Sequence, residues 1–199
     1  FYKPELGPGE DASSQLRDKG IDPASIRLVI LTHLHIDHAS AIADFPDSTL
    51  IVTANEWEAA TSGAMPFREG YRREQFDYAF DYRTVSFDTD DVNSYASFGR
   101  TIDLFGDGSI RLASTSGHTS GHQSLIVRLK DRDMVIGGDA VYLSSQLEPG
   151  SDLPGRIVDE HNFRRTLQEL RLFHSQYPES VITPGHDKAF YDSAPTVWE

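Results

Sequence analysis

Four metal-binding side chains crowd into one short stretch of this chain, Thr32-His33-Leu34-His35-Ile36-Asp37-His38. In extended backbone the side chains of His33 and His35 point the same way, because side chains repeat every second residue. The two imidazoles can therefore share one metal ion, and Asp37 and His38, where the backbone must turn, can face a second. Three imidazoles and a carboxylate are expensive to bury without a metal. Nitrogen and oxygen ligands together suit zinc and related first-row metals.

The string follows a compact run of branched apolar residues, 26–32, which predicts a buried strand. It therefore lies on the loop that leaves a strand end, where open α/β sheets tend to place chemistry. Around it we expect a helix over 11–19 that stops at Gly20, a helical turn after Asp22, a helix opening within 40–45, a strand over 49–53 and a helix over 55–60 with Asn55 as its N-cap. Residues 64–100 are rich in aromatics with poor periodicity, and we interpret them as helical excursions and loops.

The second half of the chain has a more regular pattern. We expect a hairpin of strands 100–105 and 109–114 with an Asp-Gly turn, strands over 124–129 and 133–138, a helix over 159–174 and a strand over 180–183. Strands outnumber helices, and helices sit between groups of strands. This order predicts an α/β sandwich layered helix–sheet–sheet–helix.

A zinc ion needs about four ligands, so the histidine string alone is incomplete. Three later residues, His118, Asp139 and His186, each follow a predicted strand and a glycine, which lets the backbone turn sharply where a ligand must be aimed. One convergent site at a sheet edge would use all seven residues: His33, His35, Asp37, His38, His118, Asp139 and His186. We expect His161 and His174 to be surface residues of the predicted helix, and His122 to make structural hydrogen bonds near His118.

The composition limits what the chain can bind. It has 199 residues, 38% of them hydrophobic, which suits one domain over 1–199 with a real core. A net charge of −13 argues against nucleic acid as substrate, and the chain contains no stretch of about 18 apolar residues that would span a membrane. The absence of cysteine excludes thiolate zinc sites. We expect a cytoplasmic protein, although residue 1 is Phe and the sequence reads as if it begins within a longer chain, so an upstream signal stays open.

His33-x-His35-x-Asp37-His38, the later Gly-His118 and Gly-Asp139, and the final Gly-His186 resemble the metallo-β-lactamase superfamily. The resemblance implies its four-layer αβ/βα sandwich. It also implies a first metal on His33, His35 and His118, and a second on Asp37, His38 and His186, with Asp139 bridging. Zinc is expected, and manganese, iron or cobalt would also fit. Only 32 residues precede His33, and the Asp-Thr-Gly turn of family members is absent, so we expect N-terminal strands to be missing.

Within that superfamily three segments resemble N-acyl homoserine lactonases: Gly117–Leu125 (Gly-His-Thr-Ser-Gly-His-Gln-Ser-Leu), Asp139-Ala-Val-Tyr142 and Pro184-Gly-His-Asp187. The resemblance implies a dinuclear hydrolase that opens a small-molecule lactone in quorum quenching, possible as a homodimer. The Tyr142 hydroxyl would donate to the developing oxyanion, and Asp37 would pass a proton to the leaving oxygen.

Other functions stay open at this stage. A thioesterase of the glyoxalase II type, another lactonase or a β-lactamase could use the same site, although the glyoxalase-type Gly-Asp-Thr-Leu-Phe segment is absent. A ribonuclease of this fold would want a basic surface, and a mono-iron dioxygenase would leave His38 and His186 unused. The alternative from another class is a metal-binding domain without catalysis. Metal stoichiometry distinguishes the two: one metal with a closed ligand shell would favour a structural site, and two metals with open positions would favour an enzyme.

Overall fold

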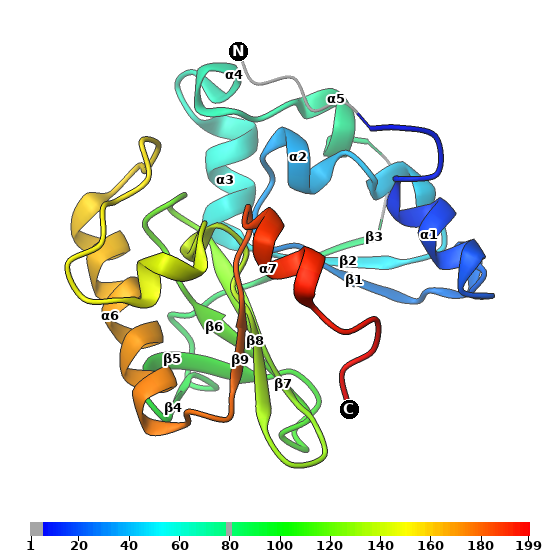
Figure 1. Ribbon diagram of the computed structural model, residues 1–199. Helices are drawn as coiled ribbons and strands as arrows, with labels where there is room; N and C mark the ends of the chain where they lie inside the picture. The colour runs from blue at the N-terminus through cyan, green and yellow to red at the C-terminus, as the bar shows by residue number, and fades with distance from the viewer. Residues whose placement is uncertain (1–5, 79–80) are drawn as a thin grey trace. The chain divides into compact units, whose positions relative to one another are not determined.

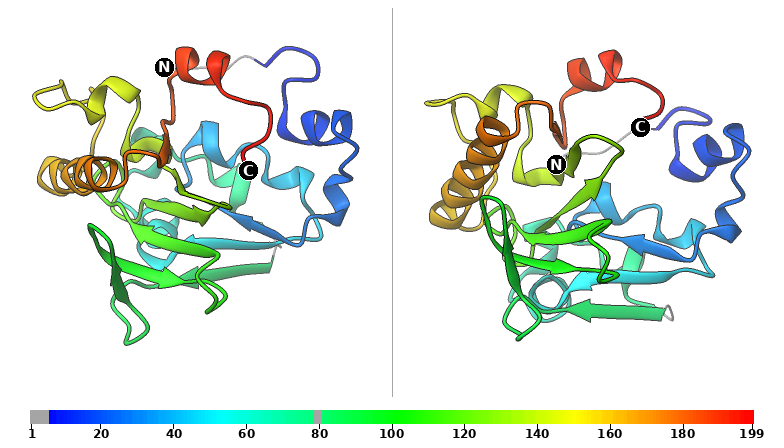
Figure 2. Two further views of the ribbon diagram at one scale, coloured as in Figure 1. Left: turned by 60° about the horizontal axis from the view of Figure 1, so that its bottom comes forward. Right: turned by 90° about the horizontal axis from the view of Figure 1, so that it is seen from below.

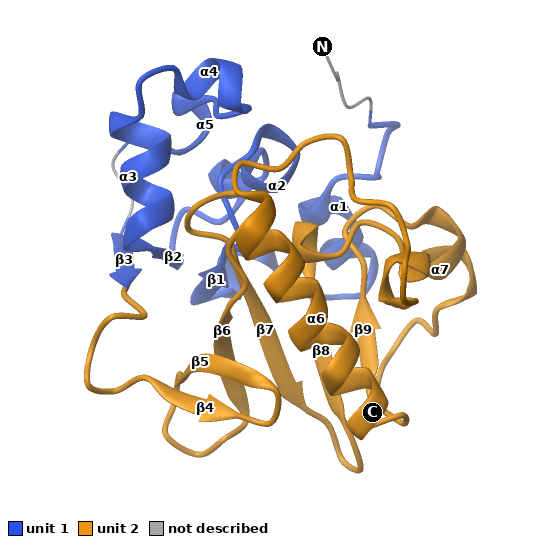
Figure 3. Ribbon diagram, turned by 90° about the vertical axis from the view of Figure 1, so that its left-hand side faces the viewer, with its two compact units in different colours: residues 1–85 blue, residues 86–199 orange. Residues whose placement is uncertain are grey.

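The computed structural model describes residues 6–78 and 81–199. The chain divides into two compact units, residues 1–85 and 86–199 (Figure 3). Each unit has one β-sheet and its own helices, and each is described by itself below. Among the described residues, no helix combines the length and the apolar character needed to cross a bilayer.

The first unit is built on a small parallel sheet with strand order β1-β2-β3 (Figure 1). The register pairs Leu28 with Thr49 and Thr49 with Asp81. Parallel neighbours need crossover segments between them, and helices fill these crossovers. The elements are α1 Ala12–Asp18, η1 Pro23–Ser25, β1 Leu28–Ile30, α2 Ile36–Ala39, η2 Ile42–Asp44, β2 Thr49–Thr53, α3 Ala54–Ser62, α4 Pro66–Glu69, α5 Arg73–Phe76 and β3 Asp81–Val85.

The core of this unit lies between β2 and the segments around it. Leu50 and Val52 on β2 are fully buried, as are Leu34 and Phe76. Trp57 of α3 packs between rings, with its centroid 4.6 Å from Tyr82 and 6.1 Å from Phe76. The histidine string therefore follows strand β1 directly, and buried apolar residues hold the surrounding segments in place.

Several predicted elements of this half are confirmed and others need correction. The helix ended by Gly20, the turn after Asp22 and the strand over 49–53 are found. The first strand is shorter than expected and only half-buried, because β1 is paired with β2 alone among the described strands. The helix expected within 40–45 is found as the short 3-10 helix η2, and a further helical turn that was not expected, α2, begins at Ile36 inside the histidine string. Asn55 is not an N-cap, since the side chain of Thr53 accepts the Glu56 N–H and caps α3.

The second unit contains a six-stranded sheet of order β4-β5-β6-β7-β8-β9 (Figure 2). All its pairs are antiparallel except β8 with β9. The elements are β4 Asn93–Tyr95, β5 Phe98–Asp103, β6 Ile110–Ser114, β7 Gln123–Arg128, β8 Asp133–Ile136, η3 Gly138–Ala140, η4 Ser144–Leu147, α6 Glu160–Gln176, β9 Val181–Thr183 and α7 Lys188–Ser193.

Helix α6 covers one face of this sheet (Figure 3). The carboxylate of Asp159 caps its first turn by accepting the Asn162 N–H. Its apolar stripe is fully buried at Phe163, Leu170 and Phe173, and it packs on residues from β5 to β9. The helix predicted over 159–174 is thus confirmed, as are the hairpin, the two following strands and the strand before His186.

Residues 64–100 were expected to be helical excursions and loops, and this prediction is wrong in part. The segment contains α4 and α5, but also β3, β4 and the start of β5. Both β3 and β4 expose most of their residues to solvent, so the apolar alternation that would have revealed them is weak.

The topology of the second unit places the C-terminal ends of three strands on the same side of its sheet. Strands β6 and β8 both run antiparallel to β7, and β9 runs parallel to β8. The C-terminal ends of β6, β8 and β9 therefore lie at the same edge of the sheet. His118, Asp139 and His186 each follow one of these ends.

Candidate metal site

In the first unit the imidazoles of the string are brought together. The ring centroids of His33 and His35 lie 4.6 Å apart, and those of His33 and His38 lie 4.1 Å apart. His35 is the N-cap of α2, so the helix turns the chain and places Asp37 and His38 in its first turn. The predicted change from extended backbone to a turn inside the string is confirmed.

The nitrogen atoms of these rings have distinct surroundings. Nδ1 of His33 contacts the hydroxyl oxygen of Thr32 at 3.1 Å. His33 is fully buried and His35 is 5% exposed, whereas Asp37 and His38 are half-buried. Nε2 of His38 lies 3.7 Å from a carboxylate oxygen of Asp37.

A buried glutamate supports the string from behind. Oε1 of Glu56, on α3, accepts the backbone N–H of Leu34 at 2.9 Å, and Glu56 is completely buried. The sequence offered a signal that the prediction did not use, since Thr53-x-x-Glu56 has the spacing of a capping box. The threonine does cap the helix, but the glutamate reaches the loop between His33 and His35.

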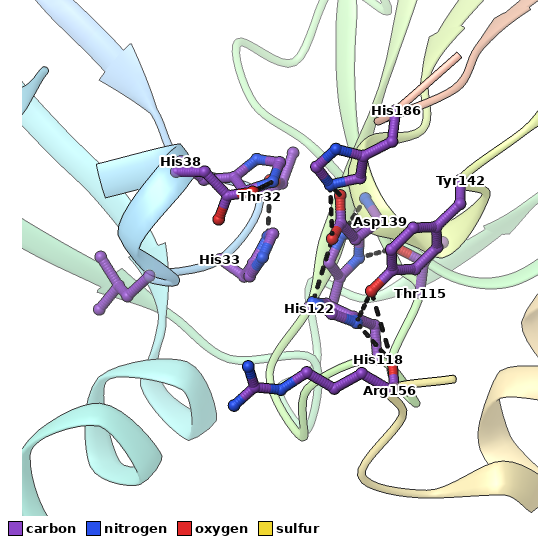
Figure 4. A network of polar contacts seen from close by, with 12 residues as sticks. Thr32, His33, His38, Thr115, His118, His122, Asp139, Tyr142, Arg156 and His186 are labelled. Carbon is purple, nitrogen blue, oxygen red and sulfur yellow. Dashed lines mark hydrogen bonds and ion pairs between the residues drawn. The ribbon is translucent and has the colours of Figure 1, made fainter. Parts of the chain in front are cut away.

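In the second unit Asp139 lies between two imidazoles (Figure 4). Its Oδ2 is 3.3 Å from Nε2 of His118, and both Oδ1 and Oδ2 are 3.2 Å from Nε2 of His186. His118 and Asp139 are buried, while the His186 side chain is 32% exposed. The three residues that sequence reasoning placed at strand ends are therefore brought together, with both carboxylate oxygens facing an Nε2 atom.

The glycines before these residues serve two different purposes. Gly117 and Gly138 have φ values of +133° and +53°, a region that favours glycine. Gly185 does not, but a Cβ atom there would overlap Oδ1 of Asp139 and lie 2.9 Å from the Gly138 carbonyl oxygen. The prediction of sharp turns holds for the first two, and lack of space explains the third.

His122 makes the structural hydrogen bonds that were predicted for it. Its Nε2 accepts the Asp139 backbone N–H at 3.1 Å, so the neutral ring carries its proton on Nδ1. That nitrogen donates to the Thr115 hydroxyl, 2.9 Å away, which lies 2.8 Å from the hydroxyl of Ser124. Ser124 in turn donates to the Gly137 carbonyl at 3.0 Å. Both nitrogens of His122 thus serve the loop that carries Asp139. His161 and His174 lie exposed on α6, as predicted.

Tyr142 is the aromatic residue beside this group (Figure 4). Its hydroxyl lies 2.8 Å from Nδ1 of His118, and both groups face the Arg156 backbone carbonyl, at 3.4 Å and 3.3 Å. Its ring stacks on His186 with centroids 5.1 Å apart. The sequence singled out Tyr142 but gave no signal for the Arg156 carbonyl, because a backbone atom on an irregular loop carries no residue pattern.

Asp187 ties two of the loops together. Its carboxylate accepts the Ser144 N–H at 2.9 Å and the Phe190 N–H at 3.1 Å, which also caps α7. The bond from the Ser144 backbone lowers the pKa of this carboxyl below its ordinary value. The backbone N–H of His186 donates to the Tyr142 carbonyl at 3.0 Å. The loops that carry Tyr142 and His186 are therefore fixed to each other.

Comparison with known proteins agrees with the fold and with these residues. The model of the metallo-beta-lactamase superfamily matches residues 6–186. The chain therefore belongs to the metallo-β-lactamase superfamily. Its architecture, an α/β fold with two sheets and helices, is the one the family resemblance implied.

Similar proteins within the superfamily carry more specific names. The N-acyl homoserine lactonase AttM of Rhizobium radiobacter is 33% identical over 188 residues, covering 94% of this chain and 67% of the relative. The N-acyl homoserine lactonase AiiB of Agrobacterium fabrum is 30% identical over 204 residues, covering 96% and 67%. A solved N-acyl homoserine lactone hydrolase, with the product N-hexanoyl-L-homoserine at its catalytic metal center, superposes with a TM-score of 0.76 at 23% identity. It covers 96% of this chain and 68% of that one.

Proposed function

We propose that this chain is a dinuclear metal-dependent hydrolase that opens the lactone ring of N-acyl homoserine lactones. One observation carries the proposal: the Asp139 carboxylate lies between two imidazoles, with Oδ2 3.3 Å from Nε2 of His118 and both oxygens 3.2 Å from Nε2 of His186. A carboxylate that faces two separate imidazoles in this way is suited to bridge two cations. The names of the relatives supply the substrate class.

The donor set fits divalent metals of the zinc type. The first unit offers three imidazoles and one carboxylate in a single short segment, and the second offers two imidazoles and one carboxylate at one sheet edge. With no cysteine in the chain, nitrogen and oxygen donors carry the site. Following the family resemblance, the first metal takes His33, His35 and His118, the second takes Asp37, His38 and His186, and Asp139 bridges. Zinc is the metal we propose, and both units together form one hydrolase domain.

Bound divalent metals would supply Lewis-acid polarisation of the lactone carbonyl and a water made acidic enough to react as hydroxide at neutral pH. The chain's own residues supply the rest. The Tyr142 hydroxyl, held beside His118, donates a hydrogen bond to the oxygen of the attacked carbonyl. Asp37 takes up the proton that the attacking water loses and passes it to the ring oxygen when the carbon–oxygen bond of the ring breaks. Each turnover consumes one water and yields an alcohol and a carboxylic acid, which releases a proton.

A pH-stat measures that proton directly. We expect the zinc-loaded protein to release protons when a long-chain N-acyl homoserine lactone is added. We expect the His33→Ala variant to release no more protons than the substrate does without protein. His161→Ala is the matched control, since it removes an exposed imidazole of the same chain. Metal analysis of the three proteins accompanies the assay, with two metals per chain expected for the wild type and for His161→Ala.

Proton release by the wild type and by His161→Ala, but not by His33→Ala, would support both the substrate class and the assignment of His33 as a metal ligand. A wild type that binds two metals but releases no protons would overturn the lactone proposal. Equal rates in His33→Ala and the wild type would overturn the assignment of His33 as a metal ligand.

A further inference from the structure

One buried glutamine holds the backbone of Tyr142. Oε1 of Gln146 accepts the N–H of Tyr142 at 2.7 Å and the N–H of Leu143 at 3.2 Å. Gln146 is 5% exposed, so these bonds form away from solvent. Its η4 turn folds the side chain back over the segment that leaves η3, because the Gln146 N–H donates to the Leu143 carbonyl at 2.9 Å.

The other end of the same amide holds a second segment. Nε2 of Gln146 donates to the Asp152 carbonyl at 3.2 Å. Four residues further along that loop is Arg156, whose backbone carbonyl lies 3.4 Å from the Tyr142 hydroxyl and 3.3 Å from Nδ1 of His118. A single side chain therefore connects the backbone of the tyrosine with the loop that carries the carbonyl facing its hydroxyl.

Helix α6 anchors this arrangement through Arg171. Its Nε and Nη2 atoms donate to the Gln146 backbone carbonyl at 3.0 Å and 2.7 Å, and Nη2 also donates to the Ser151 hydroxyl at 2.8 Å. Ser151 donates to that same Gln146 carbonyl at 3.1 Å. Arg171 is half-buried on a helix whose apolar stripe is packed on the sheet, so the loop is joined to the core of the second unit.

From these contacts we propose that Gln146 is a positioning residue for Tyr142, with Arg171 as its anchor. The inference rests on the proposed lactone hydrolysis, in which Tyr142 donates to the oxyanion. Gln146 has the amide that the position requires, because one end accepts two N–H groups and the other donates to a carbonyl. Leucine would remove both functions, and glutamate would keep the acceptor but turn a carboxylate oxygen toward the Asp152 carbonyl.

Kinetics test the proposal. Because a displacement of about 1 Å in a catalytic group can lower a rate up to about a hundredfold, we expect Gln146→Leu to lower kcat about tenfold. KM and zinc content should stay within about twofold of the wild-type values, since the Gln146 amide contacts the backbone of Tyr142, Leu143 and Asp152 and none of the proposed metal ligands. The kcat of Gln146→Glu should lie between that of the wild type and that of Gln146→Leu. Gln168→Leu, an exposed glutamine on α6, is the matched control and should match the wild type.

A double-mutant cycle separates positioning from general damage. If Gln146 acts through Tyr142, Gln146→Leu should lower kcat less than about twofold in a Tyr142→Phe background, because the hydroxyl that it places is already gone. A full tenfold loss in that background would overturn the proposal. So would a Gln146→Leu variant with wild-type kcat.

Amide hydrogen exchange tests the same geometry without the substrate. In the zinc-loaded protein, we expect Gln146→Leu to speed exchange at Tyr142 and Leu143, and Gln168→Leu to leave it unchanged. Unchanged exchange in Gln146→Leu would overturn the proposed connection. If the wild type does not hydrolyse lactones, the function proposal fails, and this measurement alone decides whether Gln146 holds Tyr142.

Discussion

The hydroxyl of Tyr142 lies 2.8 Å from Nδ1 of His118, on the side of the imidazole opposite the nitrogen that faces Asp139. The two nitrogens of His118 thus have separate tasks. If Nε2 binds a metal, the neutral ring carries its proton on Nδ1 and donates it to the tyrosine oxygen or to the Arg156 carbonyl. When it donates to the tyrosine oxygen, the Tyr142 proton is left for an acceptor in the substrate.

This relationship makes Tyr142→Phe an informative variant. The ring and its stacking on His186 remain, so we expect zinc content to match the wild type. Loss of one oxyanion donor typically lowers kcat about a hundredfold or more, and we expect a loss of about that size. Tyr177→Phe is the control, because Tyr177 is an exposed tyrosine of the same unit, 41% accessible. A full rate in Tyr142→Phe would remove the residue from the mechanism.

Glu56 gives a prediction about the histidine string. Replacement by leucine removes the acceptor of the buried Leu34 N–H, which should cost about 1–3 kcal/mol of unfolding free energy. It should also weaken zinc binding, because the segment from His33 to His35 loses its support. Glu56→Gln keeps an acceptor oxygen and should lose less on both measures, and Glu58→Leu, exposed on the same helix, should lose neither.

Urea unfolding and zinc titration of these variants give the two numbers. A Glu56→Leu protein that is destabilised but binds zinc as tightly as the wild type would limit Glu56 to a role in folding.

The pH dependence of stability should respond to Glu169. Burial raises the pKa of its carboxyl above the ordinary value, although Arg165 acts in the opposite direction. A carboxyl with a raised pKa in the folded state favours folding while it is protonated, and that stability is lost as the pH rises through the folded-state pKa. Glu169→Gln should therefore be more stable than the wild type at pH 7. The difference should vanish below the unfolded-state pKa of about 4.3.

Urea midpoints at pH 7 and pH 4 check this prediction. Glu160→Gln, an exposed glutamate on the same helix paired with Arg164, is the control and should show no such gain. A Glu169→Gln variant less stable than the wild type at pH 7 would mean that the Arg165 pairing outweighs the cost of burial.

These features differ in how far the sequence could reveal them. Positions of His118, Asp139 and His186 were predictable, because each follows an apolar strand and a glycine. Strand direction then brings them to one edge, since β6, β8 and β9 run the same way. Strand β3 was missed because its exposed residues blur the alternation that marks a half-buried strand.

The supporting residues were harder to find for a different reason. Gln146 and Glu56 act on backbone N–H groups, 4 and 22 residues away respectively. A backbone group has the same chemistry at every residue, so no pattern of side chains announces such a contact. Only the folded chain shows that a glutamine beyond η3 and a glutamate on α3 hold the segments that carry the chemistry.

The last prediction concerns Gly185, which precedes His186. A Cβ atom at this position would overlap Oδ1 of Asp139, one of the two carboxylate oxygens that face His186. The residue has no positive φ, so alanine can adopt its backbone conformation, and Gly185→Ala should act through the contacts of the new Cβ with the Asp139 carboxylate and with the Gly138 carbonyl oxygen. We expect Asp139 to be displaced and zinc affinity to fall at least about tenfold, since Asp139 is the residue proposed to bridge the two metals and its displacement would weaken the binding of both.

Competition with a chelator measures that affinity. The matched control is Gly155→Ala, because a Cβ atom there meets nothing within 4 Å. It should bind zinc as the wild type does. If Gly185→Ala kept wild-type affinity, the Asp139 carboxylate would have room to rotate away from the new methyl group without loosening the metals. The position of Asp139 between the two imidazoles would then not be needed for tight metal binding, and the proposal that it bridges the metals would be overturned.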